Sequence, residues 1–375
     1  MKIGILKESK ERENRVALSP DIVKQLIKKG FEIVIENEAG VKSSFSDEDF
    51  KQAGATISDK REVCNADVVM KVNAPTLEEA GLIKEGAVVI SLLYAYTQPE
   101  LLNVFNSRKI SAFAMDAVPR ISRAQKMDAL SSQSNLAGYK AVIMAADTVG
   151  KIFPLMMTAA GTITPAKVLI FGAGVAGLQA IATARRLGAV VEVTDVRPET
   201  KEQVESLGGR FLVVEGADQV KTEGGYAKEV SKEFLDKQKQ LIEDRIKEAD
   251  VVITTALLMG RKSPILVTED MVKSMKPGAV IVDMAVESGG NCALAEYNKT
   301  VVKHGVTIIG ESNIPALLPV NASQLYATNI SALLLHLATK DAFKWEMDEE
   351  ITKGALITHQ GELVHAFTKS ILDKK

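Results

Sequence analysis

Three glycines, Gly172, Gly174 and Gly177, stand at G-x-G-x-x-G spacing in the stretch KVLIFGAGVAGLQAIATARRLG. The pattern follows an apolar, strand-like run and opens a helix-like run, which is the context in which such a loop binds the pyrophosphate of a dinucleotide. The first glycine permits the tight turn, the second lets the backbone approach the phosphates, and the third lets strand and helix pack closely. The N–H groups at the helix start favour the negative charge. The stretch therefore predicts a dinucleotide loop, and a glycine-rich turn in a non-binding fold of the same class is the alternative.

Asp195 ends the next strand-like run, AVVEVTD. A carboxylate at this position can accept hydrogen bonds from both ribose hydroxyls and repels a 2′-phosphate, which favours NAD(H) over NADP(H). Arg197 follows closely and leaves the other choice open, because an arginine near the ribose can accommodate that phosphate.

A second polar stretch, PRISRAQKMDALSSQSN at residues 119–135, crowds charged and amide side chains into a short connection. If it lines a cleft, these donors and acceptors could hold a nicotinamide carboxamide and its ribose in an otherwise apolar pocket. A solvated loop is the alternative. The side chains in question are Arg120, Arg123, Gln125, Asp128, Ser131, Ser132 and Gln133.

The elements that must position these residues are strand-like apolar runs that alternate with helix-length segments along the chain. Continuous Val/Ile/Leu runs between helices indicate parallel strands covered on both faces. We therefore predict an α/β fold with two doubly wound, Rossmann-like parallel-sheet domains joined by long helices. The runs include KIGILKE, FEIVIE, ADVVMKV, GAVVISLLY and ISAFAMDAV, then KVLIFGAG, AVVEVTDV, RFLVVEG, DVVITTAL, AVIVDMAV and VTIIGES.

The domain boundaries are expected at two long helices, near residues 131–153 and 322–341. We expect a first domain at residues 1–133 with a returning tail at 322–375, a second domain at residues 134–321, and the cleft between them.

Two shorter segments are also interpretable. The tail ALITHQGELVHAF is typical of a hairpin turning at Gln360 and Gly361. The Lys/Glu-rich stretch 226–250 is most simply a solvated helix with oppositely charged pairs at helical spacing.

Composition narrows the class of protein. The 375 residues suggest two domains, and 46% apolar with 25% charged residues is the balance of a globular protein in water. A formal net charge of -2 gives no broad basic field for nucleic acid or anionic lipid. The two cysteines, Cys64 and Cys292, lack metal-ligand spacing and are interpreted as buried or idle thiols in a reducing compartment. The N-terminus has no secretory h-region, and the apolar runs are too short to span a bilayer.

Taken together, these stretches resemble the NAD(H)-binding component, domain I, of the proton-translocating nicotinamide nucleotide transhydrogenases, a soluble alpha subunit where that subunit is split. In that family a hydride passes between NAD(H) and NADP(H), coupled to proton movement across a membrane. NADP(H) and the proton path belong to other components. The similarity covers essentially the whole chain and is carried by RISRAQKMDALSSQSNLAGYKAVI, MMTAAGTITPAKVLIFGAGVAGLQAIATARRLGA, TKEQVESLGGRF, GGYAKE, VVITTAL and IVDMAVESGGN.

The resemblance implies partners and a location. It implies NAD(H) bound to this chain, NADP(H) on a partner component, and a membrane-spanning partner. It also implies a homodimer that is cytoplasmic and held peripherally at the inner or plasma membrane through those subunits. It gives no nucleic-acid partner and no metal.

The resemblance also assigns site residues. On the nicotinamide side, the residues assigned a catalytic role are Arg120, Gln125, Asp128 and Ser131, with further cofactor contacts at Ile121, Ser122, Arg123, Leu130 and Ser132. The turn and ribose contacts fall on Gly172, Gly174, Val175, Ala176, Gly177, Asp195, Val196 and Arg197.

Two further stretches complete the implied site. A mobile loop that closes over the nucleotide matches KTEGGYAKE, with Tyr226 at its tip and cofactor contacts at Gly225 and Tyr226, and an ordinary loop before a charged helix is the alternative. Ala256 and Leu257 follow the strand DVVITT, at the carboxyl end where a ligand is expected.

The runner-up is an amino-acid oxidoreductase, because the family is related to alanine dehydrogenase. By that resemblance, Arg15 and Lys71 stand where the dehydrogenase holds its substrate. Its catalytic histidine, however, is replaced by the stretch Leu93, Tyr94 and Ala95, and its catalytic aspartate by Glu287. None of the four histidines is assigned a catalytic role: His304, His336, His359 and His365.

The missing histidine has a chemical interpretation. Oxidising an amine or alcohol removes a proton along with the hydride, so a positioned base contributes about 100-fold or more. Passing a hydride between two nicotinamide rings moves no proton at the reacting carbons and needs only oriented rings in a site that excludes water. The sequence therefore favours hydride exchange with a partner's NADP(H). An NADH-sensing module without hydride transfer is a third hypothesis.

Overall fold

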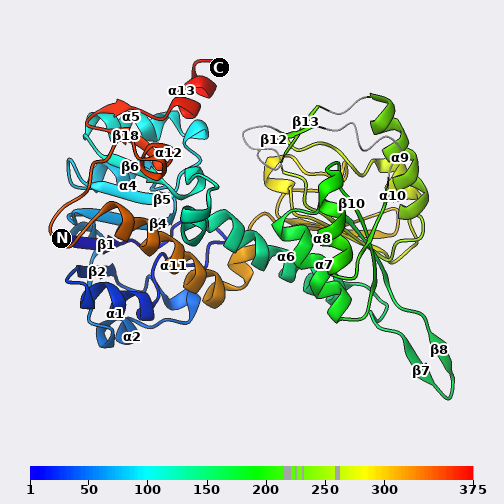
Figure 1. The fold of residues 1–375 in the computed structure, drawn as a ribbon. Helices are drawn as coiled ribbons and strands as arrows, with labels where there is room; N and C mark the ends of the chain where they lie inside the picture. Colours follow the sequence, from blue (N-terminus) through cyan, green and yellow to red (C-terminus); the bar gives the residue numbers. More distant parts are fainter. Residues whose placement is uncertain (214–220, 224–225, 230–231, 258–261, 375) are drawn as a thin grey trace. The chain divides into compact units, whose positions relative to one another are not determined.

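The structure is a computed structural model that describes residues 1–213, 221–223, 226–229, 232–257 and 262–374 (Figure 1). Contacts between Cα atoms divide the chain into two compact units. The first unit comprises residues 1–133 and 315–375, and the second comprises residues 134–314. The first division falls within the long helix α6 (Ala129–Thr148), and the chain returns to the first unit at Pro315 rather than at the expected residue 322.

The first unit is built on an eight-stranded sheet with the order β19-β18-β6-β5-β4-β1-β2-β3. The pairs from β3 to β6 are parallel, whereas the C-terminal strands β18 and β19 join antiparallel. The expected tail hairpin is confirmed, and Gln360 and Gly361 at its turn both have positive φ. The strands are β1 (Lys2–Ile5), β2 (Glu32–Glu36), β3 (Thr56–Ser58), β4 (Val68–Asn73), β5 (Val88–Leu92), β6 (Ser111–Ala114), β18 (Leu356–His359) and β19 (Glu362–Leu363).

Helices cover both faces of this sheet because side chains alternate along its strands. In β4, for example, Val68 and Met70 pack into one apolar cluster with α1, α2 and α11, and Val69 into a second with α3, α4 and α5. The helices are α1 (Pro20–Lys28), α2 (Asp47–Gln52), α3 (Lys60–Cys64), α4 (Leu77–Leu82), α5 (Pro99–Ser107), α11 (Pro319–Leu337), α12 (Glu350–Ala355) and α13 (Ala366–Leu372), and the short 3₁₀ helices are η1 (Val41–Ser43), η2 (Ala95–Thr97), η3 (Met115–Ala117) and η4 (Ser122–Met127).

The second unit has a seven-stranded sheet with the order β11-β10-β9-β14-β15-β17-β16, parallel except for the edge strand β16. Alternate residues of β9 again enter different clusters, Val168 and Ile170 with α6 and α7, and Leu169 and Phe171 with α9 and α10. The elements are β9 (Lys167–Phe171), β10 (Val190–Thr194), β11 (Arg210–Phe211), β14 (Val251–Thr254), β15 (Val280–Asp283), β16 (Lys299–Lys303), β17 (Val306–Gly310), α7 (Val175–Arg186), α8 (Lys201–Ser206), α9 (Lys232–Ile246), α10 (Glu269–Ser274), η5 (Pro198–Thr200), η7 (Val286–Ser288) and η8 (Ile314–Leu317), the last of which spans the second division.

These two sheets confirm the predicted fold class, since each is a mostly parallel sheet between helical layers. In the second sheet the strand order reverses between β9 and β14, so the loops after these two strands flank the topological switch point. Ligands of open α/β sheets bind at such a point, outside the carboxyl ends of the strands.

Two antiparallel strand pairs were not predicted, and one helix begins later than expected. The antiparallel pair β7 (Met156–Thr158) and β8 (Gly161–Ile163) extends from the second unit (Figure 1). A second pair, β12 (Lys221–Glu223) and β13 (Tyr226–Glu229), lies where only a loop was expected. The charged helix α9 consequently begins at Lys232 rather than near Tyr226. It is not solvated all round, because Ile242 and Ile246 are buried in the core.

Candidate functional site

The three glycines lie where strand β9 turns into helix α7, and each has a different environment. Gly172 has a φ of +98°, a conformation that favours glycine. A Cβ on Gly177 would overlap the carbonyl oxygen of Gly172, so this position needs a glycine for close packing. A Cβ on Gly174 would meet nothing within 4 Å, so open space lies beside the backbone at the N-cap of α7. Space at a helix N-terminus is what a pyrophosphate requires.

Val175 and Ala176 form the first turn of α7, and Val175 is exposed. A Cβ on Gly138 of α6 would overlap the Ala176 carbonyl oxygen, so α6 packs tightly against this turn within the second unit. The helix start is therefore held by its neighbours, which preorganises its N–H groups.

Asp195 follows strand β10 directly, but its carboxylate is already engaged by protein donors. The Arg197 side chain donates from Nε to Oδ1 over 2.9 Å and from a terminal nitrogen to Oδ2 over 2.7 Å. The backbone N–H groups of Ala173 and Arg197 donate over 2.6 and 2.8 Å. The expectation of a carboxylate open to the ribose is thus incomplete, because Arg197 lies on it. Val196, between the two, is partly buried.

Ala256 and Leu257 follow β14, on the other side of the switch point. The Ala256 N–H donates to Asn291 Oδ1 over 3.0 Å, and Asn291 Nδ2 donates back to the Ala256 carbonyl oxygen over 2.9 Å. Leu257 is 48% exposed. The neighbouring Thr255 hydroxyl donates to the Phe171 carbonyl oxygen over 2.9 Å, joining this loop to the end of β9.

Asn291 and Asp283 are supporting residues that the sequence reasoning did not assign. Asp283 accepts hydrogen bonds from the Thr254 hydroxyl and from the backbone N–H groups of Ala285, Asn291 and Cys292. The available signal was IVDMAVESGGN, in which an aspartate ends a strand and an asparagine follows two glycines. Both glycines, Gly289 and Gly290, have positive φ.

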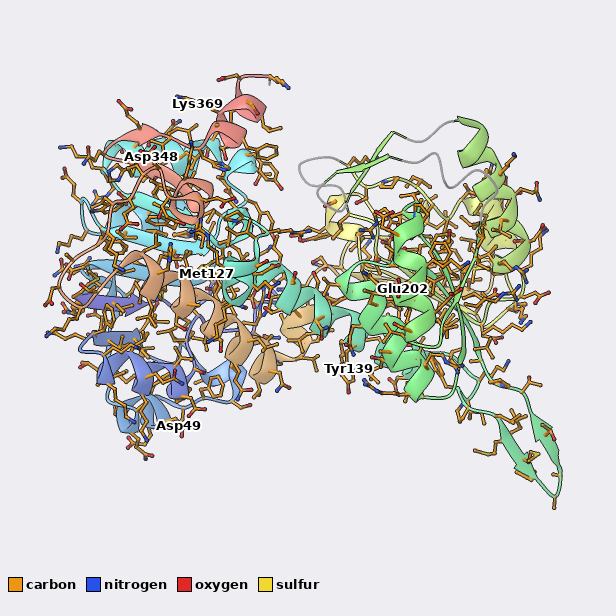
Figure 2. The ribbon with its side chains drawn as sticks, viewed as in Figure 1. Asp49, Met127, Tyr139, Glu202, Asp348 and Lys369 are labelled. Atoms are coloured by element: carbon orange, nitrogen blue, oxygen red, sulfur yellow. The ribbon has the colours of Figure 1, made fainter. Side chains whose placement is uncertain are left out.

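The polar stretch of the first unit forms η4 and the start of α6, and Met127, labelled in Figure 2, ends η4. Arg120, Gln125 and Asp128 line one pocket of about 220 Å³, together with Pro119, Ile121, Ser122 and Ala124. Asp128 also caps α6, because its carboxylate accepts from the Ser131 N–H over 2.8 Å and from the Ser131 hydroxyl over 2.6 Å. The predicted polar cluster thus partly lines a small pocket and partly caps a helix.

Other residues of this stretch contact protein groups outside the pocket. The Arg123 guanidinium pairs with Glu349 over 2.9 Å and Glu350 over 3.2 Å. Leu130 packs against the apolar core of the first unit. The Ser132 hydroxyl donates to Asn329 Oδ1 over 2.6 Å. Arg123, Leu130, Ser131 and Ser132 do not line the 220 Å³ pocket in the described part of the chain.

Gly225 lies outside the described residues. Of Tyr226 the structure describes its place as the first residue of β13, where it pairs with Glu223.

Arg15 and Lys71, the positions of substrate binding in the dehydrogenase hypothesis, are each paired with a buried carboxylate. Arg15 contacts Glu13 through Nε over 2.8 Å and a terminal nitrogen over 2.7 Å, and also donates to Gln133 over 2.9 Å. Lys71 Nζ lies 2.7 Å from Glu79, with both side chains at most 2% exposed. Burial opposes ionisation of Glu13, but the attraction and hydrogen bonds of Arg15 outweigh it and lower the Glu13 pKa to about 2.

The loop after β5, where the dehydrogenase would keep its histidine, is held by Asp116. The Leu93 and Tyr94 N–H groups donate to its carboxylate over 2.7 and 3.1 Å, and Tyr94 has a φ of 43°. Glu287, at the position of the dehydrogenase aspartate, is exposed in η7.

The four histidines have structural neighbours elsewhere. His336 contacts Glu349, His304 contacts Glu269, His359 contacts Ser111, and His365 caps α13 through Thr368. None lines the pocket of Arg120 and Gln125 as far as the structure describes the chain.

Neither cysteine has the surroundings of a reactive thiol. Cys64 and Cys292 are both buried and unbridged, and burial raises each thiol pKa to about 11, so both are unreactive thiols. Within the described ranges, no cluster of side chains could hold a metal ion. No helix of that same portion of the chain combines the length and apolar character needed to cross a membrane.

Comparisons with known proteins agree with this architecture. The family model for the alanine dehydrogenase/PNT N-terminal domain matches residues 4–137, and the one for the C-terminal domain matches residues 141–366. The first portion of the split NAD(P) transhydrogenase subunit alpha of Rhodospirillum rubrum is 51% identical, over 97% of this chain and 98% of that protein. The alanine dehydrogenase of Bacillus subtilis is 33% identical, over 97% of this chain and 93% of that protein. A crystal structure of a transhydrogenase from Sinorhizobium meliloti superimposes with a TM-score of 0.90 at 45% identity, covering 97% of this chain and all of that one. The chain belongs to the alanine dehydrogenase/PNT family.

Proposed function

We propose that the chain is the NAD(H)-binding component of a proton-translocating transhydrogenase. It exchanges a hydride between NAD(H) and NADP(H) held on a partner component. The whole-length similarity to a transhydrogenase alpha subunit supports this, and so does the sheet topology of the second unit. Open space beside Gly174 at the start of α7 is consistent with a pyrophosphate there, and the switch point between β9 and β14 is where this architecture binds ligands.

The observation that favours this function over an amino-acid dehydrogenase is the pairing of Arg15 and Lys71. Arg15 forms an ion pair with the buried Glu13, and Lys71 forms one with the buried Glu79. The positive charge of each is therefore already neutralised and is less able to bind a substrate carboxylate. The loop after β5 also carries Leu93 and Tyr94 in place of a histidine. Amine oxidation needs a positioned base, whereas hydride exchange between rings does not.

In the proposed reaction the protein positions the nicotinamide ring, and the cofactor supplies the chemistry. A bound nicotinamide supplies or accepts the hydride. Arg120, Gln125 and Asp128 would hold the ring side, since they share one pocket in the first unit and supply donors and acceptors of the kind a carboxamide requires. Ser131 would act through Asp128, whose carboxylate it fixes by two hydrogen bonds.

The proposal extends to the assembly. Partners would be an NADP(H)-binding component and a membrane-spanning component, with the chain a homodimer held peripherally at a membrane through them. The name of the Rhodospirillum relative, which marks it as one portion of an alpha subunit, supports the existence of further subunits.

The test is to titrate the purified chain with NADH, following nicotinamide fluorescence, in the presence of pyruvate and ammonium. We expect saturable binding without NADH consumption. Adding an NADP(H)-binding transhydrogenase component with NADPH and a spectrally distinct NAD⁺ analogue should then give reduction of the analogue. Steady NADH oxidation by pyruvate and ammonium would establish the dehydrogenase instead. Binding without any transfer in the complete mixture would establish a sensing module.

A further inference from the structure

The Asp195 carboxylate is saturated by donors within the second unit. From the described residues it accepts four hydrogen bonds, two from the backbone N–H groups of Ala173 and Arg197 and two from nitrogens of the Arg197 guanidinium. An ionised carboxylate offers about four lone-pair positions. A ribose diol that binds Asp195 therefore needs acceptor positions on the carboxylate that protein donors already occupy.

The four donors differ in how easily they can leave. The two backbone N–H groups are fixed, one in the glycine loop between Gly172 and Gly174 and the other just after β10. The guanidinium ends a flexible side chain, and it remains 19% exposed whereas the Asp195 side chain is 4% exposed. The two guanidinium nitrogens are therefore displaced more easily than the two backbone N–H groups.

We propose that the Arg197 guanidinium and the 2′,3′-diol of an adenosine ribose compete for the same two acceptor positions of Asp195. Binding then exchanges two N–H donors for two O–H donors, and Arg197 limits the affinity for the nucleotide. This inference rests on the proposed function, since it concerns how the second unit binds NAD(H).

This exchange of hydrogen-bond donors at Asp195 favours ligands that carry hydroxyl donors of their own. A vicinal diol replaces both donors that the guanidinium withdraws. A 2′-phosphate carries acceptors and negative charge, so it replaces none of them and leaves the carboxylate unsatisfied and repelled. The ligand class is therefore an adenosine nucleotide with a free 2′,3′-diol. A ligand without that diol would displace the Arg197 donors without replacing them and would bind more weakly.

The test replaces Arg197 by methionine, which keeps a long stem and removes the donors. We expect the Arg197→Met variant to bind NADH about fivefold more tightly, the size expected for losing one competing, partly exposed ion pair. Its melting temperature without nucleotide should fall, because Asp195 loses two partners. A merely structural arginine would lower the melting temperature without tightening binding.

Control variants keep the result interpretable. Arg210→Met removes an arginine of the adjacent strand, whose guanidinium lies 3.4 Å from Glu192, and should leave the NADH Kd unchanged. Arg197→Lys keeps the positive charge but loses the paired nitrogens of the guanidinium. It should bind NADH more tightly than wild type by a smaller factor, and it decides the matter if Arg197→Met does not fold. ADP-ribose and its 2′-phosphate, used as probes, should differ in Kd by at least tenfold in the wild type.

The failures are distinguishable. Absence of NADH binding to the wild-type chain would refute the proposed function itself. Normal wild-type binding with equal or weaker binding to the Arg197 variants would leave that function standing. It would overturn the competition, because Arg197 would then be a simple ligand or a bystander.

Discussion

The Ser132 hydroxyl donates to Asn329 Oδ1 over 2.6 Å, and the same asparagine donates from Nδ2 to the Lys126 carbonyl oxygen over 2.8 Å. Asn329 belongs to α11, Ser132 to the first turn of α6, and Lys126 to η4. One buried side chain therefore joins η4, at the residue after Gln125, to the start of α6, with Asp128 between the two joined residues.

This bridge predicts a positioning role for Asn329. Replacing it by alanine should cost about 1–2 kcal/mol of unfolding free energy, because a partly buried hydroxyl and a partly buried carbonyl lose their partner. Hydride transfer in the reconstituted system should slow about tenfold, since small displacements of positioning groups are costly, with less change in the NADH Kd. Thr328→Ala, at the exposed neighbouring position, is the matched control. A loss of stability with an unchanged transfer rate would show that the bridge is only structural.

Gln125→Asn should separate binding from transfer. The variant keeps the amide but withdraws it by about 1.5 Å, one carbon–carbon bond. We expect hydride transfer to fall at least about tenfold and NADH affinity to change less than about threefold, because orientation matters more to the reaction than to binding. Single-turnover rates and fluorescence titrations measure the two quantities, and Gln52→Asn on α2 serves as control. Equal losses in both would mean that Gln125 merely binds.

The glycine loop offers a pair of substitutions with opposite outcomes. Gly174→Ala places a methyl group in open space, so unfolding free energy should change by less than about 0.5 kcal/mol, while NADH binding weakens at least about tenfold. Gly177→Ala forces an overlap with the Gly172 carbonyl oxygen and should destabilise the chain by about 1–3 kcal/mol. Denaturant unfolding and NADH titration of both variants test this. Unimpaired NADH binding by Gly174→Ala would argue that the space beside it holds no phosphate.

Acid should weaken the fold through Glu13. Its pKa is lowered from 4.5 to about 2 in the folded chain, so the unfolded chain takes up a proton first as the pH falls. The associated stability is present above about pH 4.5 and is lost as the pH falls toward 2, on the order of 3 kcal/mol at most. Urea unfolding between pH 7 and 3 should show a steeper loss for wild type than for Glu13→Gln, which starts lower. Parallel slopes would contradict the role of Glu13.

The sequence predicts those regions of the fold that depend on neighbours in the chain. The strand β9 and the start of α7 follow from an apolar run and spaced glycines, and the turn at Gln360 and Gly361 from a local signal. The β12–β13 pair was missed because KTEGGYAKE has no apolar alternation, the pattern that identifies a strand buried on one face.

The site was predictable as a set of residues but not as a set of contacts. The spacing of Arg120, Gln125 and Asp128 indicated a polar cluster, and the structure brings these three around one pocket. Arg197 is only two positions from Asp195, but the sequence does not state that its side chain folds back onto that carboxylate. The partnership of Asn329 with Ser132 was hidden for another reason, because its residues are 197 positions apart. That contact is set by tertiary packing.

The buried pairs of Arg15 with Glu13 and Lys71 with Glu79 also govern which mutational routes are open to this chain. Removing either member alone strands a charge in the core, at a typical cost of about 3–5 kcal/mol, whereas joint replacement by apolar residues can be neutral. Single substitutions therefore cannot replace either cation without a large loss of stability, even where the cation binds no ligand. Each is retained by its own partner, so a descendant chain would keep the cations of a substrate pocket whether or not it had a substrate to hold.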